Sequence, residues 1–147
     1  MNADKKINSV YSTIDSEKVN IENEEWEKIL PKDMYVVARE KGTERAFTGK
    51  FWDHHESGTY YCAACGNPLF GSNGKFESSC GWPSFFEPIG KDSIIYAADN
   101  SYGMKRTEVI CGRCSAHLGH IFEDGPPPTG LRYCINSVIL NFEPGRG

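Results

Sequence analysis

Apolar residues recur at helical spacing in the first third of the chain. In residues 22–30 the apolar positions fall on one face, acidic side chains occupy the first turn, where they suit the helix dipole, and Pro31 ends the segment. Residues 32–40 have the pattern of a second short helix, with Gly42 just past its end. A strand through residues 35–37 is the alternative for this second segment. The pattern therefore predicts two short helices near the amino terminus.

From about Phe47 onward the pattern changes to short β-rich runs that are separated by Gly, Asn and Pro. Short strands divided by turn residues at this spacing are typical of antiparallel sheets. The sequence therefore predicts a mainly β domain of the α+β class, with the helices at one end. The predicted strands cover residues 59–62, 94–98, 107–111, 120–122 and 134–142.

The first twenty residues show no clear apolar period. We expect residues 1–20 to form a polar amino-terminal extension, a tail or a loosely packed segment, in front of a single domain over residues 21–147. No apolar run approaches the roughly 20 residues that span a membrane. Residues 1–23 also lack the apolar stretch of a secretory signal. These features predict a cytoplasmic protein with no membrane partner.

Composition and charge limit the class of partner. The 147 residues suffice for one hydrophobic core, and 16 basic against 20 acidic residues give a net charge of −4. A domain that binds DNA or RNA through phosphate contacts normally carries the opposite balance. We therefore expect no nucleic acid partner.

In a reducing compartment the six cysteines point to metal binding or redox catalysis rather than to disulfides. Four of them form two Cys-x-x-Cys pairs, Cys62 with Cys65 and Cys111 with Cys114. A two-residue gap lets both thiolates of a pair reach one metal, and two pairs supply the ligands of a closed tetrahedral zinc site. Because four thiolates leave no open position, the predicted zinc is structural.

Two alternatives exist for these residues. A thioredoxin-like redox motif would lie in a strand–helix–strand pattern, which neither pair has. A mixed site with His117 and His120, which follow the second pair, would leave Cys62 and Cys65 without a metal. The four-cysteine site is therefore favoured.

The two remaining cysteines, Cys80 and Cys134, are candidates for chemistry. If residues 132–136 form a strand, its period of two places Arg132, Cys134 and Asn136 on one face. The arginine charge favours a thiolate and so lowers the cysteine pKa, as a nucleophile requires. The alternative is a buried cysteine on an ordinary strand, and the adjacent arginine argues against it.

Cys80 lies in a loop that contains Gly and Pro, and such a loop can carry a thiol toward a partner. The neighbouring aromatic residues, Trp82 and Phe85 among them, belong either to the core or to the wall of a pocket for a small apolar group. His117 and His120 are candidates for proton transfer, because the unperturbed pKa of histidine is near neutrality.

These residues occur in motifs that resemble the methionine-R-sulfoxide reductases, the B-type peptide-methionine sulfoxide reductases, in their zinc-containing, two-cysteine subtype. The resemblance extends from about Glu22 to Phe142 with its motifs in order, and Ala46 stands where proline is common. The segments that carry it are residues 44–49, 80–85, 106–109, 117–125 and 132–137.

The resemblance implies two antiparallel sheets that form a barrel-like β domain, with short amino-terminal helices and a structural zinc site. It also implies that Cys134 is the catalytic nucleophile and that Cys80 is the resolving cysteine. Trp82 then packs on the substrate methyl group, and Phe85 and Asp124 are also assigned to substrate binding. The polar side of the implied site consists of His117, His120, Asp124, Arg132 and Asn136.

The implied reaction is reduction of the R epimer of protein-bound methionine sulfoxide. Cys134 attacks the sulfoxide sulfur while His117 or His120 protonates the oxygen, and the resulting sulfenic acid condenses with Cys80 to a disulfide. A thioredoxin-like dithiol then reopens the disulfide. We expect the protein to act as a monomer.

Two other functions remain as alternatives. A zinc-stapled β module could bind a peptide or small ligand through Trp82, although Arg132 beside Cys134 argues against a purely binding site. A general thiol–disulfide oxidoreductase could use Cys80 and Cys134 without a sulfoxide substrate.

Overall fold

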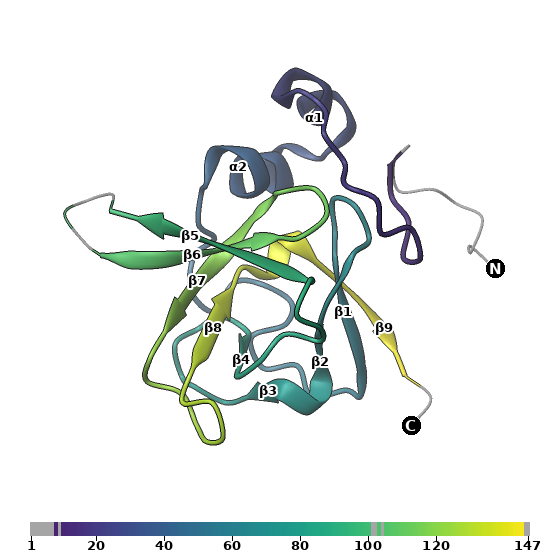
Figure 1. The fold of residues 1–147 in the computed structure, drawn as a ribbon. Helices are drawn as coiled ribbons and strands as arrows, with labels where there is room; N and C mark the ends of the chain where they lie inside the picture. Colours follow the sequence, from purple (N-terminus) through teal and green to yellow (C-terminus); the bar gives the residue numbers. More distant parts are fainter. Residues whose placement is uncertain (1–7, 9, 101–102, 104, 146–147) are drawn as a thin grey trace.

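The computed structural model of the chain describes residues 8, 10–100, 103 and 105–145. Over these residues the fold is mainly β, with two short helices that precede all the strands (Figure 1). The elements are α1 (Asn23–Ile29), α2 (Lys32–Glu40), β1 (Gly58–Cys62), β2 (Pro68–Gly71), η1 (Ser72–Gly74), β3 (Lys75–Phe76), β4 (Ser84–Phe85), β5 (Ile94–Asp99), β6 (Arg106–Cys111), β7 (His117–Phe122), β8 (Arg132–Ile135), η3 (Ser137–Ile139) and β9 (Leu140–Pro144).

The strands form two antiparallel sheets. The three-stranded sheet has the order β2-β1-β9, and the six-stranded sheet has the order β3-β4-β8-β7-β6-β5. Within the described residues, no strand pairing joins the outer strands of either sheet to close it. The expected pair of antiparallel sheets is therefore confirmed, but the barrel-like arrangement is not a closed barrel.

Aromatic side chains from both sheets meet in the core between them. Phe70 on β2 stacks on Phe85 on β4 with ring centroids 4.3 Å apart, and Tyr60 on β1 meets the edge of the same Phe85 ring at 5.2 Å. Tyr133 on β8 packs edge-on against Phe70. Offset and edge-on ring pairs add to the free energy of burial, so these contacts hold the two sheets together.

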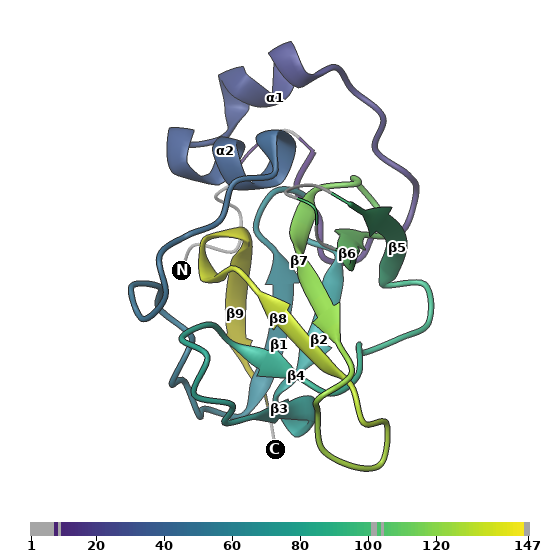
Figure 2. The ribbon, with the colours of Figure 1, turned by 90° about the vertical axis from the view of Figure 1, so that its left-hand side faces the viewer.

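Both predicted helices are present, at one end of the sheets (Figure 2). Trp26 of α1 and Val37 of α2 are buried, and α2 packs against β7 and η3. The alternative of a strand over residues 35–37 is wrong, because these residues lie within α2.

The structure differs from the predicted strands in two places. The run over residues 134–142 is divided between β8 and β9, which belong to different sheets. The chain turns because Asn136 binds the Leu118 carbonyl through its side chain and the hydroxyl of Ser137 accepts a hydrogen bond from the Phe51 amide. The short strands β2, β3 and β4 are not among the predicted ones.

The described part of the amino-terminal extension is attached to the domain. The Ser12 amide donates to the Cys65 carbonyl at 2.8 Å, and the Val19 amide donates to the Arg113 carbonyl at 2.8 Å. This differs from the loose segment that the sequence predicts. The remainder of that prediction, residues 1–7 and 9, lies outside the described residues.

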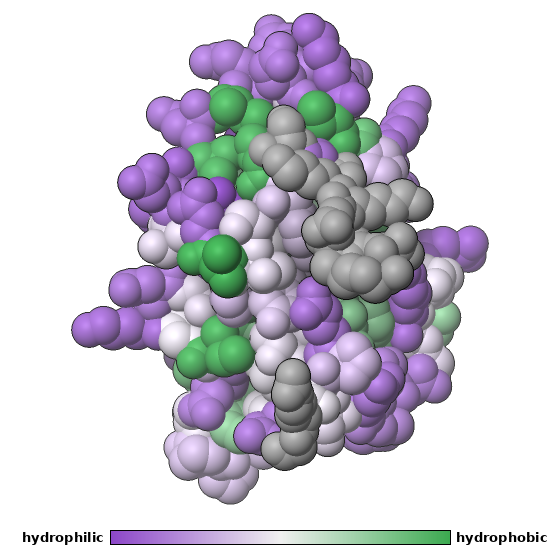
Figure 3. All heavy atoms as spheres, turned by 90° about the vertical axis from the view of Figure 1, so that its right-hand side faces the viewer, coloured by the Kyte–Doolittle hydropathy of each residue, from purple (hydrophilic) through white to green (hydrophobic). Residues whose placement is uncertain are grey.

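The surface agrees with the polar composition. On the face shown in Figure 3, apolar side chains gather mainly near the helices at the top, and the apolar groups below them are separated by polar residues. None of the described helices is both long enough and apolar enough to cross a membrane.

Candidate active site and metal centre

The four cysteines of the two Cys-x-x-Cys pairs converge on one point. Cys62, Cys65, Cys111 and Cys114 are all buried, and their sulfur atoms lie within 4.8 Å of one another. The closest approaches join the two pairs, with 3.7 Å between the sulfurs of Cys62 and Cys114 and 3.6 Å between those of Cys65 and Cys111. Thiolates at this spacing form a group that can hold a metal ion.

The two pairs have the same backbone geometry. In the first, the Cys62 amide donates to the Asn67 carbonyl and the Gly66 amide donates to the Cys62 carbonyl. In the second, the Cys111 amide donates to the Ala116 carbonyl and the Ser115 amide donates to the Cys111 carbonyl. Both Gly66 (φ +87°) and Ser115 (φ +66°) adopt a left-handed conformation, which costs a residue with a Cβ more than it costs glycine.

Each pair lies at the tip of a hairpin, one in each sheet. The first hairpin is β1–β2 of the three-stranded sheet, and the second is β6–β7 of the six-stranded sheet. A metal held by all four thiolates therefore links the two sheets.

Arg113 connects the metal centre to the amino-terminal extension. Its guanidinium is buried and donates to the carbonyls of Cys65 at 2.6 Å, Val10 at 3.1 Å and Glu17 at 2.9 Å. It also forms an ion pair with Asp15 at 3.3 Å. A cation with three carbonyl acceptors holds residues 10–17 against both Cys-x-x-Cys turns.

Replacing Arg113 by alanine is expected to lower the free energy of unfolding by about 3 kcal/mol and to speed metal release to a chelator, because one buried and two partly buried carbonyls lose a charged donor. Asp15→Asn is the control. The Asp15 side chain is half exposed, so its ion pair contributes about 1 kcal/mol or less. Denaturant unfolding and a chelator-release rate measure both effects, and equal behaviour of the two variants would contradict the connecting role of Arg113.

The other two cysteines form a second pair at the opposite side of β7. Cys134 on β8 and Cys80, in the loop before β4, place their sulfur atoms 3.7 Å apart, and both side chains are partly exposed. The Cys80 sulfur also accepts a hydrogen bond from the Ser78 hydroxyl at 3.0 Å, and the Ser84 hydroxyl lies 3.4 Å away. Two thiols at this distance can form a disulfide with a small movement.

The contact between the two thiols shifts their pKa values in opposite directions. The hydrogen bond from Cys134, with smaller contributions from Ser78 and Ser84, lowers the pKa of Cys80 to about 4 against the opposing effect of burial. The same hydrogen bond, together with burial, raises the pKa of Cys134 above its ordinary value. The Arg132 charge lowers the pKa of Cys134 as the sequence predicts, but in the dithiol form Cys80 outweighs it. In the reduced pair this hydrogen bond therefore favours negative charge on Cys80 over negative charge on Cys134.

Cys80 is accordingly expected to react with iodoacetamide well below neutral pH. Its rate should follow a thiolate that forms near pH 4, whereas an ordinary thiol becomes reactive only as pH rises toward 9. In Cys134→Ala the largest cause of the low pKa is absent, so the inflection should move upward by more than one pH unit. Mass spectrometry of Cys80 after short exposure at each pH measures this. An unchanged profile in the variant would contradict the shared proton.

A small cavity of about 110 Å³ opens beside Cys134. Trp82 forms one wall, and its indole nitrogen donates to the Glu44 carbonyl at 3.0 Å, which fixes the ring. His120 and Asn136 contribute polar groups to the lining. The cavity thus places an aromatic surface, a thiol and hydrogen-bonding groups around one small volume.

The two histidines have different surroundings. His120 lines the cavity, and its Nε2 lies 2.7 Å from an Asp99 carboxylate oxygen. His117 is buried outside the lining, with Nδ1 2.7 Å from Glu108. Burial lowers the pKa of His117 although the bond with Glu108 opposes the shift. Of the two, His120 is the one placed to exchange a proton with a ligand in the cavity.

Arg132 and Asp124 pair with each other outside this lining. The guanidinium donates to both Asp124 oxygens, at 2.8 and 3.2 Å, and lies over the Phe122 ring with 4.5 Å between the guanidinium carbon and the ring centroid. The pair lowers the pKa of Asp124 and raises that of Arg132. Asp124, expected to bind substrate, therefore acts in this structure as the partner that holds Arg132.

Phe85, also expected to bind substrate, belongs to the core instead. Its side chain is fully buried and stacks on Phe70. Alternation along β4 explains the difference, because Ser84 pairs with Cys134 and faces the thiols while Phe85 faces the other sheet. Trp82 alone of the two predicted aromatic residues lines the cavity.

Several residues of the site are not among the sequence candidates. Arg106 and Thr43 line the cavity, and Ser78 and Ser84 contact the Cys80 sulfur. Gly119 lines it too, and a Cβ at this position would overlap the Cys134 carbonyl, so only glycine lets β7 approach β8 there. The available signal was the position of Ser84, Arg106 and Gly119 inside motifs of the family resemblance.

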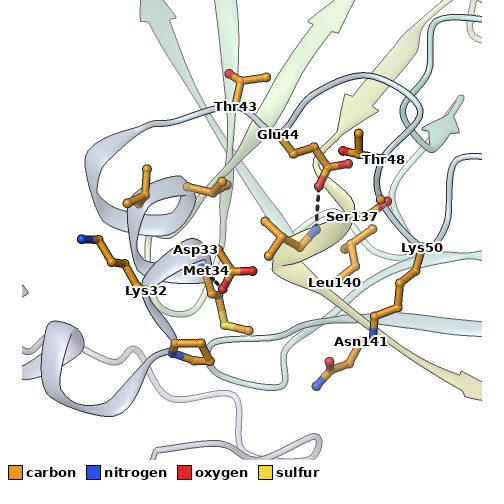
Figure 4. A pocket seen from close by; sticks show the side chains of 15 residues that line it. Lys32, Asp33, Met34, Thr43, Glu44, Thr48, Lys50, Ser137, Leu140 and Asn141 are labelled. Atoms are coloured by element: carbon orange, nitrogen blue, oxygen red, sulfur yellow. Dashed lines mark hydrogen bonds between the residues drawn. The ribbon is translucent and has the colours of Figure 1, made fainter.

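A larger cavity of about 960 Å³ adjoins the small one. It lies between α2, η3 and the segment 43–50, and Figure 4 shows Met34, Leu140 and Lys50 around it. Thr43 lines both cavities. The described lining of the large cavity contains no cysteine or histidine, so the redox chemistry belongs to the small one.

Comparisons with known proteins agree with this site. A family model described as SelR domain matches residues 30–144. The chain is 57% identical over 120 residues to a protein of Thiobacillus denitrificans, which covers 82% of this chain and 91% of that protein. It is 56% identical over 131 residues to a Pseudomonas putida protein, and the match covers 89% of this chain and 98% of that protein. It is 58% identical over 120 residues to a protein of Methanosarcina barkeri, and the match covers 82% of this chain and 84% of that protein. All three carry the name peptide methionine sulfoxide reductase MsrB. The chain therefore belongs to the SelR-domain family, the family of these peptide methionine sulfoxide reductases.

Proposed function

We propose that the protein reduces the R epimer of methionine sulfoxide in peptides and proteins to methionine. The observation that carries this proposal is the Cys80–Cys134 pair, with 3.7 Å between its sulfurs, beside a small cavity walled by Trp82. A general thiol–disulfide oxidoreductase needs the thiol pair but has no use for a closely fitted apolar wall. The cavity therefore favours a small sulfur-containing substrate group.

The cavity offers three different surroundings to a sulfoxide. The methyl group packs against Trp82, the oxygen faces His120 and Asn136, and the side-chain stem points to solvent. Three distinct contacts around a stereogenic sulfur are sufficient to select one epimer. Asn136 is in addition a positioning residue, because its side chain accepts from the Glu44 amide and donates to the Leu118 carbonyl.

The reaction begins with a proton transfer within the thiol pair. The Cys80 thiolate accepts the proton of Cys134, and the Cys134 sulfur attacks the sulfoxide sulfur while His120 protonates the oxygen. Arg132 favours the negative charge on Cys134 at this step. Methionine leaves, and the oxygen stays on Cys134 as a sulfenic acid.

Cys80 then resolves the sulfenic acid. Its sulfur attacks Cys134, the S–O bond breaks, and the oxygen leaves as water while the disulfide forms. The thiol pair loses two electrons, and the departing oxygen receives two protons, one of them from His120, which together balance the reduction of the sulfoxide to methionine and water. A thioredoxin-like dithiol supplies two electrons to return the pair to the reduced form.

We propose that zinc occupies the four-cysteine site. With zinc–sulfur bonds of about 2.3 Å, the sulfurs of a tetrahedral site lie about 3.8 Å apart. The 3.6 and 3.7 Å approaches between the two cysteine pairs fit this value. Bound zinc supplies a crosslink between two hairpins and no open coordination position, so no reaction step passes through it.

We also propose a domain organisation, a cellular compartment and an oligomeric state for the protein. Residues 21–147 are the reductase domain and residues 1–20 its extension, of which residues 10–19 contact the metal centre. The protein acts as a cytoplasmic monomer without nucleic acid or membrane partners.

An assay with separated epimers tests the proposed function. Each epimer of a methionine sulfoxide peptide is incubated with the protein and dithiothreitol, and the methionine peptide and the protein thiols are measured. Turnover of the R epimer alone is the expected result. Binding without turnover would favour a peptide-binding module, and oxidation of the thiols by an unrelated disulfide without sulfoxide reduction would favour a general oxidoreductase.

A further inference from the structure

A β-bulge brings the two histidines of β7 to the same face of the sheet. In a regular strand, residues 117 and 120 would point to opposite faces, because side chains alternate. On β6, however, Val109 pairs with Gly119, and the next residue, Ile110, pairs with residue 117 rather than 118. The ring centroids of His117 and His120 are consequently 5.3 Å apart. The charge on one ring therefore affects proton binding on the other.

Glu108 lies in the same row of the sheet as the reaction site. It pairs with His120 across β6 and β7, and His120 pairs with Cys134 across β7 and β8. Residues that pair directly in an antiparallel sheet project their side chains to the same face. Glu108 is outside the described lining of the small cavity, so it acts on the cavity through His120.

The Glu108 carboxylate is buried between His117 and Lys41. One oxygen lies 2.7 Å from Nδ1 of His117, and the other lies 3.2 Å from Nζ of Lys41, which directly follows α2. The Glu108 side chain is 3% exposed, whereas that of Lys41 is 64% exposed. Burial of a carboxylate is costly unless it has such partners. Glu108 is therefore a fixed negative charge beside the histidine pair.

The surroundings of His117 indicate which ring nitrogen carries a proton. A carboxylate oxygen only accepts hydrogen bonds, so Nδ1 donates to Glu108. Nε2 is buried and has no hydrogen-bond partner among the described residues. A buried N–H without an acceptor is rare and costly, which favours a bare Nε2. His117 is therefore neutral with its proton on Nδ1, in agreement with burial, which lowers its pKa.

Other charged groups also act on the two rings. Asp99 contacts His120 and pairs with Arg106 at 3.6 Å, and Arg132 acts on Cys134. The titratable and charged groups around the histidines are Asp99 on β5, Arg106 and Glu108 on β6, Arg132 and Cys134 on β8, and Lys41 after α2. Because Glu108 and Lys41 lie outside the described lining of the small cavity, substitutions there change the charge beside the histidines without changing the cavity wall.

We propose that Glu108 is a positioning residue of the reaction, which fixes the tautomer of His117 and, in balance with Lys41, keeps the proton of the histidine pair on His120. This inference rests on the proposed function, in which His120 protonates the sulfoxide oxygen. A negative charge next to His120 stabilises its protonated form, and the Lys41 cation moderates that effect.

The pH dependence of the first step tests this role. The single-turnover rate of methionine formation from an R-epimer sulfoxide peptide falls on the basic side as His120 loses its proton. In Glu108→Gln, which conserves shape and removes the negative charge, this fall should move to lower pH by about one unit. In Lys41→Met it should move to higher pH by about half a unit, because the carboxylate stays and the lost charge is exposed and partly screened.

Two controls retain the charge or remove it elsewhere. Lys41→Arg keeps the cation and should keep the wild-type profile. Lys28→Met removes an exposed cation of α1 that pairs with Glu25, and it should leave the profile unchanged. Nitrogen NMR of the histidine rings gives a readout without substrate. His117 should show a proton on Nδ1 and none on Nε2, and the His120 titration should move in opposite directions in Glu108→Gln and Lys41→Met.

The outcomes separate this inference from the proposed function. A slower reaction in Glu108→Gln and Lys41→Met with an unmoved pH profile would reduce Glu108 to a structural role and leave the reductase intact. Shifts of the same sign in both variants, an equal shift in Lys28→Met, or a proton on Nε2 of His117 would also overturn the inference. Lys41 is exposed, so its variants test the proposal even if Glu108→Gln does not fold. Absence of reduction by the wild-type protein would overturn the proposed function and this role with it.

Discussion

Replacing Cys134 by serine is expected to lower the reduction of methionine sulfoxide peptides by roughly a thousandfold or more with every reductant, because a serine hydroxyl does not supply a comparable nucleophile. The fold should be unaffected, since Cys134 is partly exposed and serine conserves its shape. Steady-state assays with dithiothreitol and with a dithiol protein measure the loss. Substantial activity in this variant would assign the nucleophile to Cys80, whose pKa is the lower of the two.

Cys80→Ser provides the comparison within the same pair. Its Cys134 thiol should still complete the first step, so that one equivalent of methionine peptide forms per protein molecule and Cys134 remains a sulfenic acid. Turnover with a dithiol protein should be lost, while a small thiol reductant should support it in part. A disulfide between Cys134 and another cysteine of this variant before any thiol is added, or a full rate with the dithiol protein, would contradict the resolving role of Cys80.

Residue spacing was the part of the sequence that predicted most about the site. The Cys-x-x-Cys spacing required two thiols at one turn, and the structure brings both pairs to one point. The period of two along β8 placed Cys134 opposite the buried residues Tyr133 and Ile135, as observed. Such local geometry can be predicted because it depends only on neighbours in the chain.

Long-range contacts account for most of the differences between the sequence prediction and the structure. A run of β-forming residues cannot indicate that the chain leaves one sheet at Asn136 and enters the other at Leu140, because the turn depends on partners in distant segments. Phe85 could equally have faced the site or the core, and only the pairing of Ser84 with Cys134 decides this.

Several polar residues of the site were not predicted from the sequence for a related reason. Arginines and serines are common on protein surfaces, so the residue types of Arg106, Ser78 and Ser84 do not by themselves indicate a role until the fold brings them beside the thiols and the cavity. The acidity of the thiol pair could not be predicted either. It depends on the 3.7 Å approach of two cysteines that are far apart in the sequence.

Removal of one metal ligand is expected to have the largest effect on stability. Cys62→Ser should lose most of its metal and unfold at a much lower temperature, because a structural metal of this type contributes on the order of 10 kcal/mol, comparable to the whole stability of a domain. Metal analysis and thermal unfolding with and without a chelator measure the change. Cys80→Ser is the matched control, since it removes a thiol outside the cluster and should keep the full metal content.

In Cys62→Ser the loss of ordered structure should spread from the metal centre to the reaction site in a definite order. Cys62 ends β1, which forms the middle of the three-stranded sheet, whereas Cys134 lies on β8 of the other sheet. Without the crosslink, amide hydrogen exchange should increase first in the β1–β2 and β6–β7 hairpins and in residues 10–19, which hydrogen-bond to them. Because β7 pairs with β8, the cavity beside Cys134 loses its His120 wall next, and activity falls with it. A Cys62→Ser protein with unchanged metal content, unfolding temperature and exchange in both hairpins would contradict a metal held by all four thiolates.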